Sequence, residues 1–437
     1  MVDAMPFRGI RYNRQVVGDL AKVLCPPYDV ISPQQQDGLY QRSPHNIIRV
    51  EMGRELAGDN EEENRYSRAA SELTGWRREG VLQQEPEPSF YVLRTVRREG
   101  VRERSLRGVF AGVRLEEFSR GVVLPHEETR KGPKEDRLRL FQATRASVSP
   151  VLGLYRDGAG EVDRVLERVQ TREPVVSIEE EGGTRHQLWA VSDQVVVQAM
   201  RSALSPKRVY IADGHHRYET ALYLRGLEKA RATRWTGREA VNYCFMCLIE
   251  VSRGGLQLGG YHRGLGGLAE GELQAVRIRL ESLFDWSLED REAGSTGLQG
   301  FLAGRDWSSR PRPAIGLADG EGRLWALALK DPLPEGALPK PGVPALGLCE
   351  SWVLNEGVIR PVFGEASPPE LVYLHDVVEM AALLRKGAIS LAFLLPPLKI
   401  ESFEAVVLSG ERLPPKSTYF YPKLPTGLVI FPLEGEV

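Results

Sequence analysis

A short apolar segment that runs directly into Asp-Gly-His-His-Arg constrains this chain more than any other feature. Residues 208–212 read Arg-Val-Tyr-Ile-Ala, which predicts a strand, and residues 218–225 read as a helix. A strand, a glycine turn and a helix can together hold an anion. The first N–H groups of a helix have no partner within it, and the helix dipole adds positive potential at the same place. The pattern therefore predicts an anion site between strand and helix.

The side chains at this turn have the chemistry of a phosphate site. Gly214 lets the backbone approach a ligand closely, and Arg217 offers a fixed fork of donors to a phosphate. His215 and His216 add donors that can be charged or neutral near pH 7. Asp213 could cap the helix, or it could hold a metal ion or a hydroxyl group. An N-cap aspartate with a surface arginine is the plain alternative, but two adjacent histidines are costly to place for packing alone.

A second dense polar segment covers residues 123–138 and follows another short apolar strand. Pro125, His126 and Glu127 emerge at the strand end, where functional residues often lie. A helix is expected over residues 134–144. A solvated loop would explain the charged residues that follow Glu127, but it explains Pro-His-Glu less well. The segment therefore predicts a functional loop.

Bulk composition bounds the classes of protein that are possible. A chain of 437 residues is expected to form two or three domains. The net charge of −2 does not show the excess of positive charge that is typical of proteins that bind duplex nucleic acid. The first residues lack the apolar core of a signal peptide, and the longest apolar run, residues 389–398, is too short to span a membrane. We therefore expect a cytoplasmic protein with no membrane and no duplex nucleic-acid partner.

Cysteine usage favours a reducing compartment and core packing. Four cysteines are few for this length. Cys244 and Cys247 have the CxxC spacing of metal and redox sites, but they lie in residues 241–251, which read as a buried strand. Residues three apart on a strand face opposite sides, and no second CxxC completes a zinc site. Both are expected to be core cysteines.

The order of apolar and polar segments predicts an α+β chain. We expect an N-terminal α+β domain over residues 1–118, a core over 119–235 and a C-terminal α+β domain over 236–437. Gly and Asp-Gly turns predict hairpins at residues 90–107 and 314–329. The remaining expectations are a strand at 46–51, a helix at 64–79, a strand at 108–115, a loop at 332–344, a helix at 377–384 and a strand at 389–395.

Further polar residues are weaker candidates for contact with a substrate. The tail over residues 410–424 places lysines, hydroxyl groups and aromatic rings between prolines, so it could touch a ligand or dock the C-terminus onto the body. For each candidate a structural role is an equal alternative, because a loop histidine is often only a satisfied polar residue. These candidates are Tyr28, Asp29, His262, Arg263, Lys416, Ser417 and Thr418.

The two polar motifs resemble those of a known superfamily. The segment from Asp213 to Tyr218 resembles the nucleotide-phosphate motif of the ParB/sulfiredoxin superfamily, in the form found in its free serine kinases. Pro125-His126-Glu127 resembles the upstream Pro-His-Glu of the same kinases. Over nearly its full length the chain also resembles a bacterial and archaeal family with a domain-of-unknown-function label, grouped with these kinases. The segments that carry this resemblance are residues 26–32, 125–127, 134–138, 212–218 and 416–423.

The resemblance implies a fold and an activity. The fold would be a central ParB/sulfiredoxin-like mixed sheet with helices, in a nucleotide-binding core, flanked by N- and C-terminal α/β extensions. The activity would be phosphoryl transfer from ADP or ATP, with Mg²⁺, to the hydroxyl of free L-serine, giving O-phosphoserine. Glu127 matches the glutamate that accepts the hydroxyl proton, and Asp213 matches the aspartate that orients the hydroxyl or the metal. The phosphate-binding positions are matched by Gly214, His215, His216 and Arg217.

Two other classes of function remain open. The first is a nucleotide-binding switch like the CTP-dependent ParB clamps, with no phosphorylated product; near-neutral charge and the lack of a helix-turn-helix pattern argue against DNA loading. The second is a metal-dependent hydrolase. Adjacent histidines at a helix start diverge, which disfavours the hydrolase. Its ligands would be His126, Glu127, Asp213, His215 and His216. Glu127 and Asp213 are 86 positions apart, more than in the compact kinases, so a shared pocket is not implied. An oligomer is possible.

Overall fold

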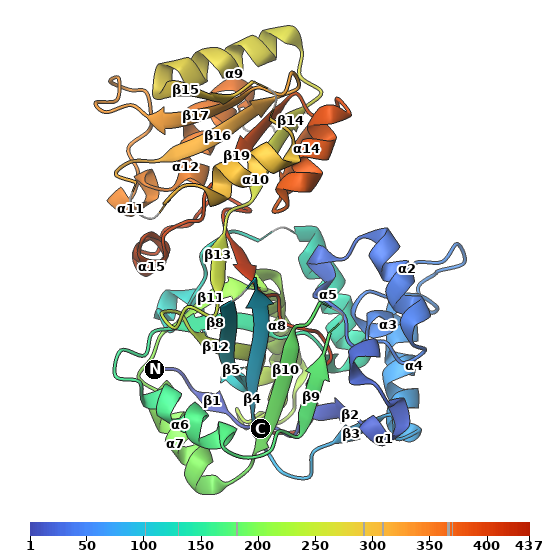
Figure 1. Ribbon diagram of the computed structural model, residues 1–437. Helices are drawn as coiled ribbons and strands as arrows, with labels where there is room; N and C mark the ends of the chain where they lie inside the picture. The colour runs from blue at the N-terminus through green and yellow to red at the C-terminus, as the bar shows by residue number, and fades with distance from the viewer. Residues whose placement is uncertain are drawn as a thin grey trace. The chain divides into compact units, whose positions relative to one another are not determined.

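The computed structural model describes residues 1–100, 102–129, 131–180, 182–291, 293–307, 310–364, 368 and 370–437. Arg130, which belongs to the expected functional loop, lies outside these ranges. The chain forms two compact units. The first unit contains Met1–Pro125, Thr129–Leu256 and Pro422–Val437, and the second contains His126–Glu128 and Gln257–Tyr421. Each unit is a mixed α/β structure with its own sheet (Figure 1).

The first unit is built on a large mixed sheet in the order β6-β11-β8-β12-β5-β4-β10-β9, with β1 beside β5. The pairs β6–β11 and β8–β12 are parallel, and the other neighbours are antiparallel. The central β12 is buried at every residue because it is covered on both faces. The strands are β1 (Ala4–Met5), β4 (Phe90–Glu99), β5 (Arg102–Arg114), β6 (Val123–Leu124), β8 (Val151–Tyr155), β9 (Val176–Glu179), β10 (Arg185–Val191), β11 (Val209–Asp213) and β12 (Tyr243–Glu250).

Two short strand pairs and a set of helices complete the first unit. The pair β2 (Ile10–Tyr12) and β3 (Leu82–Gln84) is antiparallel, as is the pair β7 (Ala146–Ser147) and β21 (Phe431–Pro432). Helix starts follow side-chain caps, as at Asn64, whose Oδ1 accepts the N–H of Tyr66. The α-helices are α1 (Arg14–Val17), α2 (Pro33–Arg42), α3 (Ile48–Glu51), α4 (Arg65–Arg78), α5 (Lys131–Thr144), α6 (Glu161–Gln170), α7 (Gln194–Leu204) and α8 (His215–Arg231).

The second unit has a sheet in the order β15-β17-β16-β19-β14-β18, in which all neighbours are antiparallel. A separate antiparallel pair joins β13 to β20. Its elements are β13 (Gln257–Gly259), β14 (His262–Gly266), α9 (Glu270–Leu283), β15 (Phe284–Asp290), α10 (Ser295–Ala303), β16 (Ala314–Asp319), β17 (Leu324–Leu329), α11 (Pro344–Gly347), α12 (Glu350–Leu354), α13 (Arg360–Phe363), β18 (Glu370–Leu374), α14 (Val377–Arg385), β19 (Leu391–Leu394), α15 (Ile400–Leu408) and β20 (Tyr419–Tyr421).

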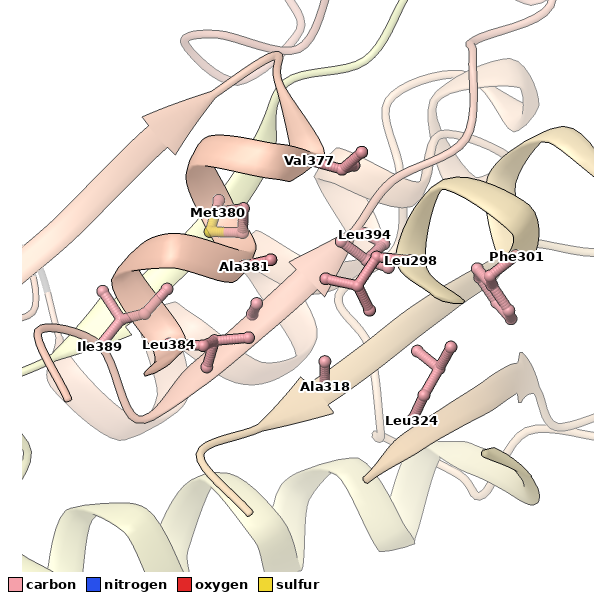
Figure 2. Packing of buried hydrophobic residues seen from close by; sticks show 11 residues of the cluster. Leu298, Phe301, Ala318, Leu324, Val377, Met380, Ala381, Leu384, Ile389 and Leu394 are labelled. Carbon is pink, nitrogen blue, oxygen red and sulfur yellow. The ribbon is translucent and has the colours of Figure 1, made fainter. Parts of the chain in front are cut away.

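Two helices of the second unit pack their apolar faces on one side of its sheet. Figure 2 shows Met380 and Leu384 of α14, with Leu298 and Phe301 of α10, lying over the strands. Met380 is fully buried, and Leu394 of β19 lies within the same cluster. Burying these side chains stabilises the unit at roughly 25 cal/mol for each Å² of apolar surface removed from water.

Several local expectations are confirmed, and the strand expected at 46–51 is wrong. The helices expected at 64–79, 134–144 and 377–384 form as α4, α5 and α14, the strand expected at 208–212 forms as β11, and both hairpins form. The expected strand at 46–51 is instead the helix α3. The Asn46 Oδ1 accepts the N–H of Ile48, and Ile47 O accepts the N–H of Glu51, so the chain closes into a helical turn. A segment this short, with only Ile47, Ile48 and Val50 apolar, cannot distinguish a buried strand from a buried helix.

Sheet pairing crosses the boundaries expected from sequence. Strand β12, expected in the range 236–437, pairs with β5 and β8 of the first unit, and residues 422–437 return to that unit. The range 108–115 is the second half of β5 and not a separate strand. All four cysteines are free and buried, as expected for core residues. Within the described ranges, no helix combines the length and apolar character needed to cross a membrane.

Candidate functional site

The expected strand-to-helix turn lies in the first unit, between β11 and α8. Gly214 stands between them with φ of 89°, a left-handed conformation that favours glycine. It occupies the N-cap position, and no side chain caps the helix there. Asp213 therefore does not cap α8, although capping was one of the roles considered for it. Its carboxylate is available for other partners.

Two cations hold the Asp213 carboxylate. Arg217 Nη2 lies 2.7 Å from Oδ2, and Lys423 Nζ lies 2.7 Å from Oδ1. All three side chains are largely buried, with exposed fractions of 4% for Arg217, 12% for Lys423 and 16% for Asp213. Burial alone would raise the pKa of Asp213, but Lys423 and Arg217 hold that pKa well below its ordinary value. Asp213 is therefore a fixed anion between two fixed cations.

The Arg217 guanidinium is folded back over the turn. Nη1 donates to the carbonyl of Pro150 at 2.5 Å. A Cβ added to Gly214 would lie 2.9 Å from Nε, so the glycine is what allows the guanidinium to reach this position. Among the described residues, Arg217 Nε is buried and has no hydrogen-bond partner. A buried donor without a partner is costly, which indicates a place for an acceptor from a ligand or water.

A second group of buried charges lies close to Arg217 in the first unit. Glu51, at the end of α3, is 1% exposed, and Arg137 of α5 places Nη1 3.5 Å from its Oε2. Burial raises the pKa of Glu51, against the lowering effects of Arg137 and Arg217. The Arg137 guanidinium also lies 4.2 Å from the ring centre of Tyr28, whose pKa burial raises to about 12. Tyr28 and Asp29, both weak candidates, thus lie within the electrostatic reach of the α8 turn.

Glu127 belongs to the second unit and is held by the C-terminal part of the chain. Its Oε2 accepts the backbone N–H of Lys416 at 3.3 Å, and its carbonyl accepts Arg412 Nη1 at 2.9 Å. Residues 126–128 run beside Leu413, whose N–H donates to the carbonyl of His126 at 2.8 Å. The structure thus brings His126 and Glu127 together with residues 412–416 of the second unit.

His126 is anchored and not open to solvent. It is 1% exposed, its Nε2 lies 2.7 Å from Thr418 Oγ1, and its ring lies edge-to-face with Phe403 at 5.0 Å. Ser417 is also buried and donates to the carbonyl of Pro414 at 2.5 Å. The Lys416 ammonium lies 4.9 Å from the ring centre of Tyr261. Of the three tail candidates, only Lys416 is not fully buried.

His262 and Arg263 lie in the sheet of the second unit, on β14. The His262 Nδ1 accepts the N–H of Leu395 at 3.1 Å, and burial lowers its pKa to about 4, with a further contribution from His375. Burial also lowers the pKa of Arg263 to about 10, and Arg263 lies over the ring of Tyr373. These contacts are with neighbouring protein groups, so a ligand-binding role for either residue stays a prediction.

Three residues that lie near Asp213 and Arg217, namely Glu51, Arg137 and Lys423, were not predicted from the sequence as site residues. Arg137 and Lys423 both lie in segments that carry the family resemblance, but neither was singled out. Their positions within residues 134–138 and 416–423 are the signal that could have found them. Glu51 lies in a segment whose pattern predicts a strand, and nothing in that pattern marks it as a site residue. Within the described ranges no three His, Cys, Asp or Glu side chains are grouped so that they could hold a metal ion.

Comparison with known proteins gives one strong match and several weak ones. No curated protein matches this chain. Solved structures with similarity include a free serine kinase in complex with AMP, at 16% identity over 74% of this chain and 92% of that chain, with a TM-score of 0.33. A conserved hypothetical protein from Pyrococcus furiosus matches at 17% identity over 74% and 95% of the two chains, with a TM-score of 0.32. SbnI from Staphylococcus aureus, truncated at its C-terminus, matches at 13% identity over 71% and 84%, with a TM-score of 0.35.

These structural similarities are low in both sequence identity and TM-score. The candidate site is therefore described only from the residues of this chain. A family model provides the firm assignment, because it matches residues 4–347 and so spans most of the sequence. The chain belongs to the family described as protein of unknown function (DUF1015).

Proposed function

We propose that this protein is a nucleotide-dependent kinase that phosphorylates the hydroxyl of a small molecule, with free L-serine as acceptor and O-phosphoserine as product. The observation that carries the proposal is the start of α8, where Arg217 and Lys423 converge on Asp213 and a buried Arg217 Nε lacks a partner among the described residues. ADP or ATP would donate the phosphoryl group in the cytoplasm. The first unit would then hold a ParB/sulfiredoxin-like nucleotide-binding core.

The chemistry of phosphoryl transfer fits this arrangement. The reaction needs in-line positioning, neutralised charge on the equatorial oxygens and a base for the attacking hydroxyl. The N–H groups at the start of α8, with Arg217 and Lys423, supply donors and positive charge for phosphate oxygens. His215, which is 2% exposed, and His216 occupy the first turn of the same helix. The motif resemblance supports the same assignment.

A bound Mg²⁺ would neutralise charge on the phosphates. Mg²⁺ keeps several waters and takes few protein carboxylates when phosphates are present, so one carboxylate such as Asp213 suits it without a larger acidic cluster. Asp213 would hold the ion or orient the acceptor hydroxyl. Glu127 is proposed as the base that takes the hydroxyl proton.

The test is phosphorus NMR of the full chain with Mg²⁺, ADP or ATP and a panel of free amino acids that includes L-serine. A new phosphomonoester signal that requires serine is expected. Glu127→Gln should abolish that signal while nucleotide binding persists. Glu128→Gln, which changes the neighbouring exposed glutamate, is the matched control and should leave turnover unchanged.

Lys423 offers a separate test of the phosphate site. Lys423→Met should weaken nucleotide binding about tenfold, which corresponds to about 1.4 kcal/mol. Lys229→Met, at the opposite end of α8, is the control. Nucleotide that binds but stays unchanged with every acceptor would favour the regulatory switch. Turnover that persists in Glu127→Gln would remove Glu127 as the base.

A further inference from the structure

The tail of the second unit contacts the Pro-His-Glu segment through both main-chain and side-chain groups. We call residues 412–418 the clasp. Arg412 Nη1 donates to the Glu127 carbonyl at 2.9 Å, Leu413 N–H donates to the His126 carbonyl at 2.8 Å, and Lys416 N–H donates to Glu127 Oε2 at 3.3 Å. The main chain on both sides of the Glu127 side chain is therefore bonded to one segment, which lies almost three hundred residues further along the sequence.

The clasp contains a strained residue at the point where it meets the carboxylate. Lys416 has φ of 58°, in the left-handed region that residues other than glycine seldom adopt. Such a conformation persists only where surrounding contacts enforce it, and it often marks a functional position. Here the residue in this conformation is the one whose N–H meets Glu127 Oε2. The left-handed φ therefore has a definite consequence, because it fixes how residues 417 and 418 are oriented relative to the peptide plane that carries this N–H.

A buried hydroxyl–imidazole contact fixes the other side of the segment. Thr418 Oγ1 lies 2.7 Å from His126 Nε2, and both residues are buried. The His126 ring is enclosed by Phe403 and Phe420, with ring centres at 5.0 and 6.0 Å. Neither side chain presents its polar atom to solvent, so their described contacts suit positioning better than contact with a substrate.

From these contacts we infer that the clasp aims the Glu127 carboxylate, with Thr418 and the left-handed Lys416 as positioning residues. The inference rests on the proposed function for the role of Glu127 as base, whereas the geometry of the clasp stands by itself. It reassigns His126, Lys416 and Thr418 from substrate contact to support of Glu127. The Lys416 main chain, and not its ammonium group, is the part that acts on Glu127.

Two substitutions at Lys416 separate the main chain from the side chain. Lys416→Gly and Lys416→Val both remove the ammonium and keep the N–H. Glycine adopts the left-handed conformation freely, whereas a β-branched residue strongly disfavours it. The kcat of Lys416→Val should therefore be at least tenfold lower than the kcat of Lys416→Gly. Equal losses in the two variants would overturn the main-chain role.

Thr418 is tested by an isosteric change and a rescue. Thr418→Val should lower kcat about tenfold with the dissociation constant of the nucleotide unchanged, and Thr418→Ser should recover most of that loss. In a Glu127→Asp background, which keeps a carboxylate but shortens its side chain, Thr418→Val should lower kcat by a smaller factor than in the unchanged protein, because both changes act through one group. Additive losses would overturn the inference.

Amide hydrogen exchange of the full chain tests the clasp without relying on turnover. Thr418→Val and Lys416→Val should speed exchange at Leu413 and Lys416 at least tenfold, while Thr418→Ser and Lys416→Gly stay within threefold of the unchanged protein. Unchanged exchange in the valine variants would overturn the clasp itself. Faster exchange in a protein that phosphorylates no acceptor would support the clasp and reject only the kinase.

Discussion

Different kinds of contact hold the two acidic residues that are proposed for catalysis. Asp213, in the first unit, is fixed by charge, because two buried cations lie 2.7 Å from its oxygens. Glu127, in the second unit, is fixed by a backbone N–H and by contacts to its own main chain. A carboxylate between cations stays ionised and resists acid. Glu127 is instead held at its main chain as well as at its carboxylate, so the position of this side chain depends on residues 412–416.

Removing the charge at Asp213 should have the largest effect. Asp213→Ala leaves Arg217 and Lys423 without their shared anion, and breaking such a buried pair costs about 3–5 kcal/mol in the free energy of unfolding. Urea denaturation followed by circular dichroism measures the loss. Glu116→Gln, which breaks the exposed i,i+4 pair with Arg120, is the control and should cost about 0–1 kcal/mol. Equal costs would mean that burial does not distinguish the two pairs.

Acid should weaken the second unit through His262 before it affects Asp213. His262 has a folded pKa of about 4 against an ordinary 6.5, so its contribution to stability is present above pH 6.5 and is lost as the pH falls towards 4. The full loss is about 3 kcal/mol. The pKa of Asp213 is lowered in the folded protein. Its contribution to the free energy of unfolding is therefore retained between pH 6.5 and 4, and it is lost only when the pH falls below the ordinary pKa range of aspartate.

The measurement for His262 is amide exchange in β14 and β19 at pH 7 and pH 4.5. Protection in these strands should fall with pH in the unchanged protein and vary much less in His262→Gln. Protection in β11 and α8 serves as the internal reference. A fall of the same size in His262→Gln would assign the acid sensitivity to another group.

Gly214, the N-cap of α8, and Gly226, within α8, should respond to alanine with opposite changes in stability. Gly214→Ala places a Cβ at φ of 89° and 2.9 Å from the Arg217 guanidinium, so it should cost about 1–2 kcal/mol and weaken phosphate binding. Gly226→Ala meets no atom within 4 Å and should stabilise α8 by up to about 1 kcal/mol. Thermal denaturation of both variants measures the contrast. Stabilisation by both would show that the turn does not need its glycine.

Thiol chemistry should affect neither unit. Cys244 and Cys247 of the first unit and Cys349 of the second are 4% exposed or less, and burial raises the pKa of Cys244 and Cys349 to about 12. We expect no labelling by a thiol reagent in the folded protein and no change in melting temperature when reductant is added. Full labelling in urea confirms the reagent. Rapid labelling of folded protein would contradict the core assignment of the CxxC pair.

Local patterns predicted the elements whose signals are complete within a few residues. The apolar strand before Asp213, the glycine and the following helix all lie within one short stretch, and the structure forms β11 and α8 there. Burial of Cys244 and Cys247 also followed from their strand, because a fully apolar run has no face to present to solvent.

Contacts between distant segments could not be predicted in this way. Lys423 lies 210 positions after Asp213 in the sequence, and nothing in the sequence around Lys423 identifies Asp213 as its partner. Thr418 and His126 were both noted as candidates, yet their contact depends on a return of the chain that periodicity does not encode. The helix at Ile48–Glu51 differs from the expected strand because a hydrogen bond to the Asn46 side chain selects one of two conformations that this short segment allows.

The return of residues 422–437 to the first unit has a consequence for the integrity of the molecule. Strand β21 pairs with β7, Ile430 exchanges backbone bonds with Ile10, and Phe431 is fully buried. A protease cut between residues 332 and 344 would therefore leave two polypeptides that remain bound, which separate on a denaturing gel but migrate together under native conditions. The two fragments, produced separately, should also reassemble. The protein is therefore suited to use as a pair of complementing fragments whose association restores the pairing of β21 with β7.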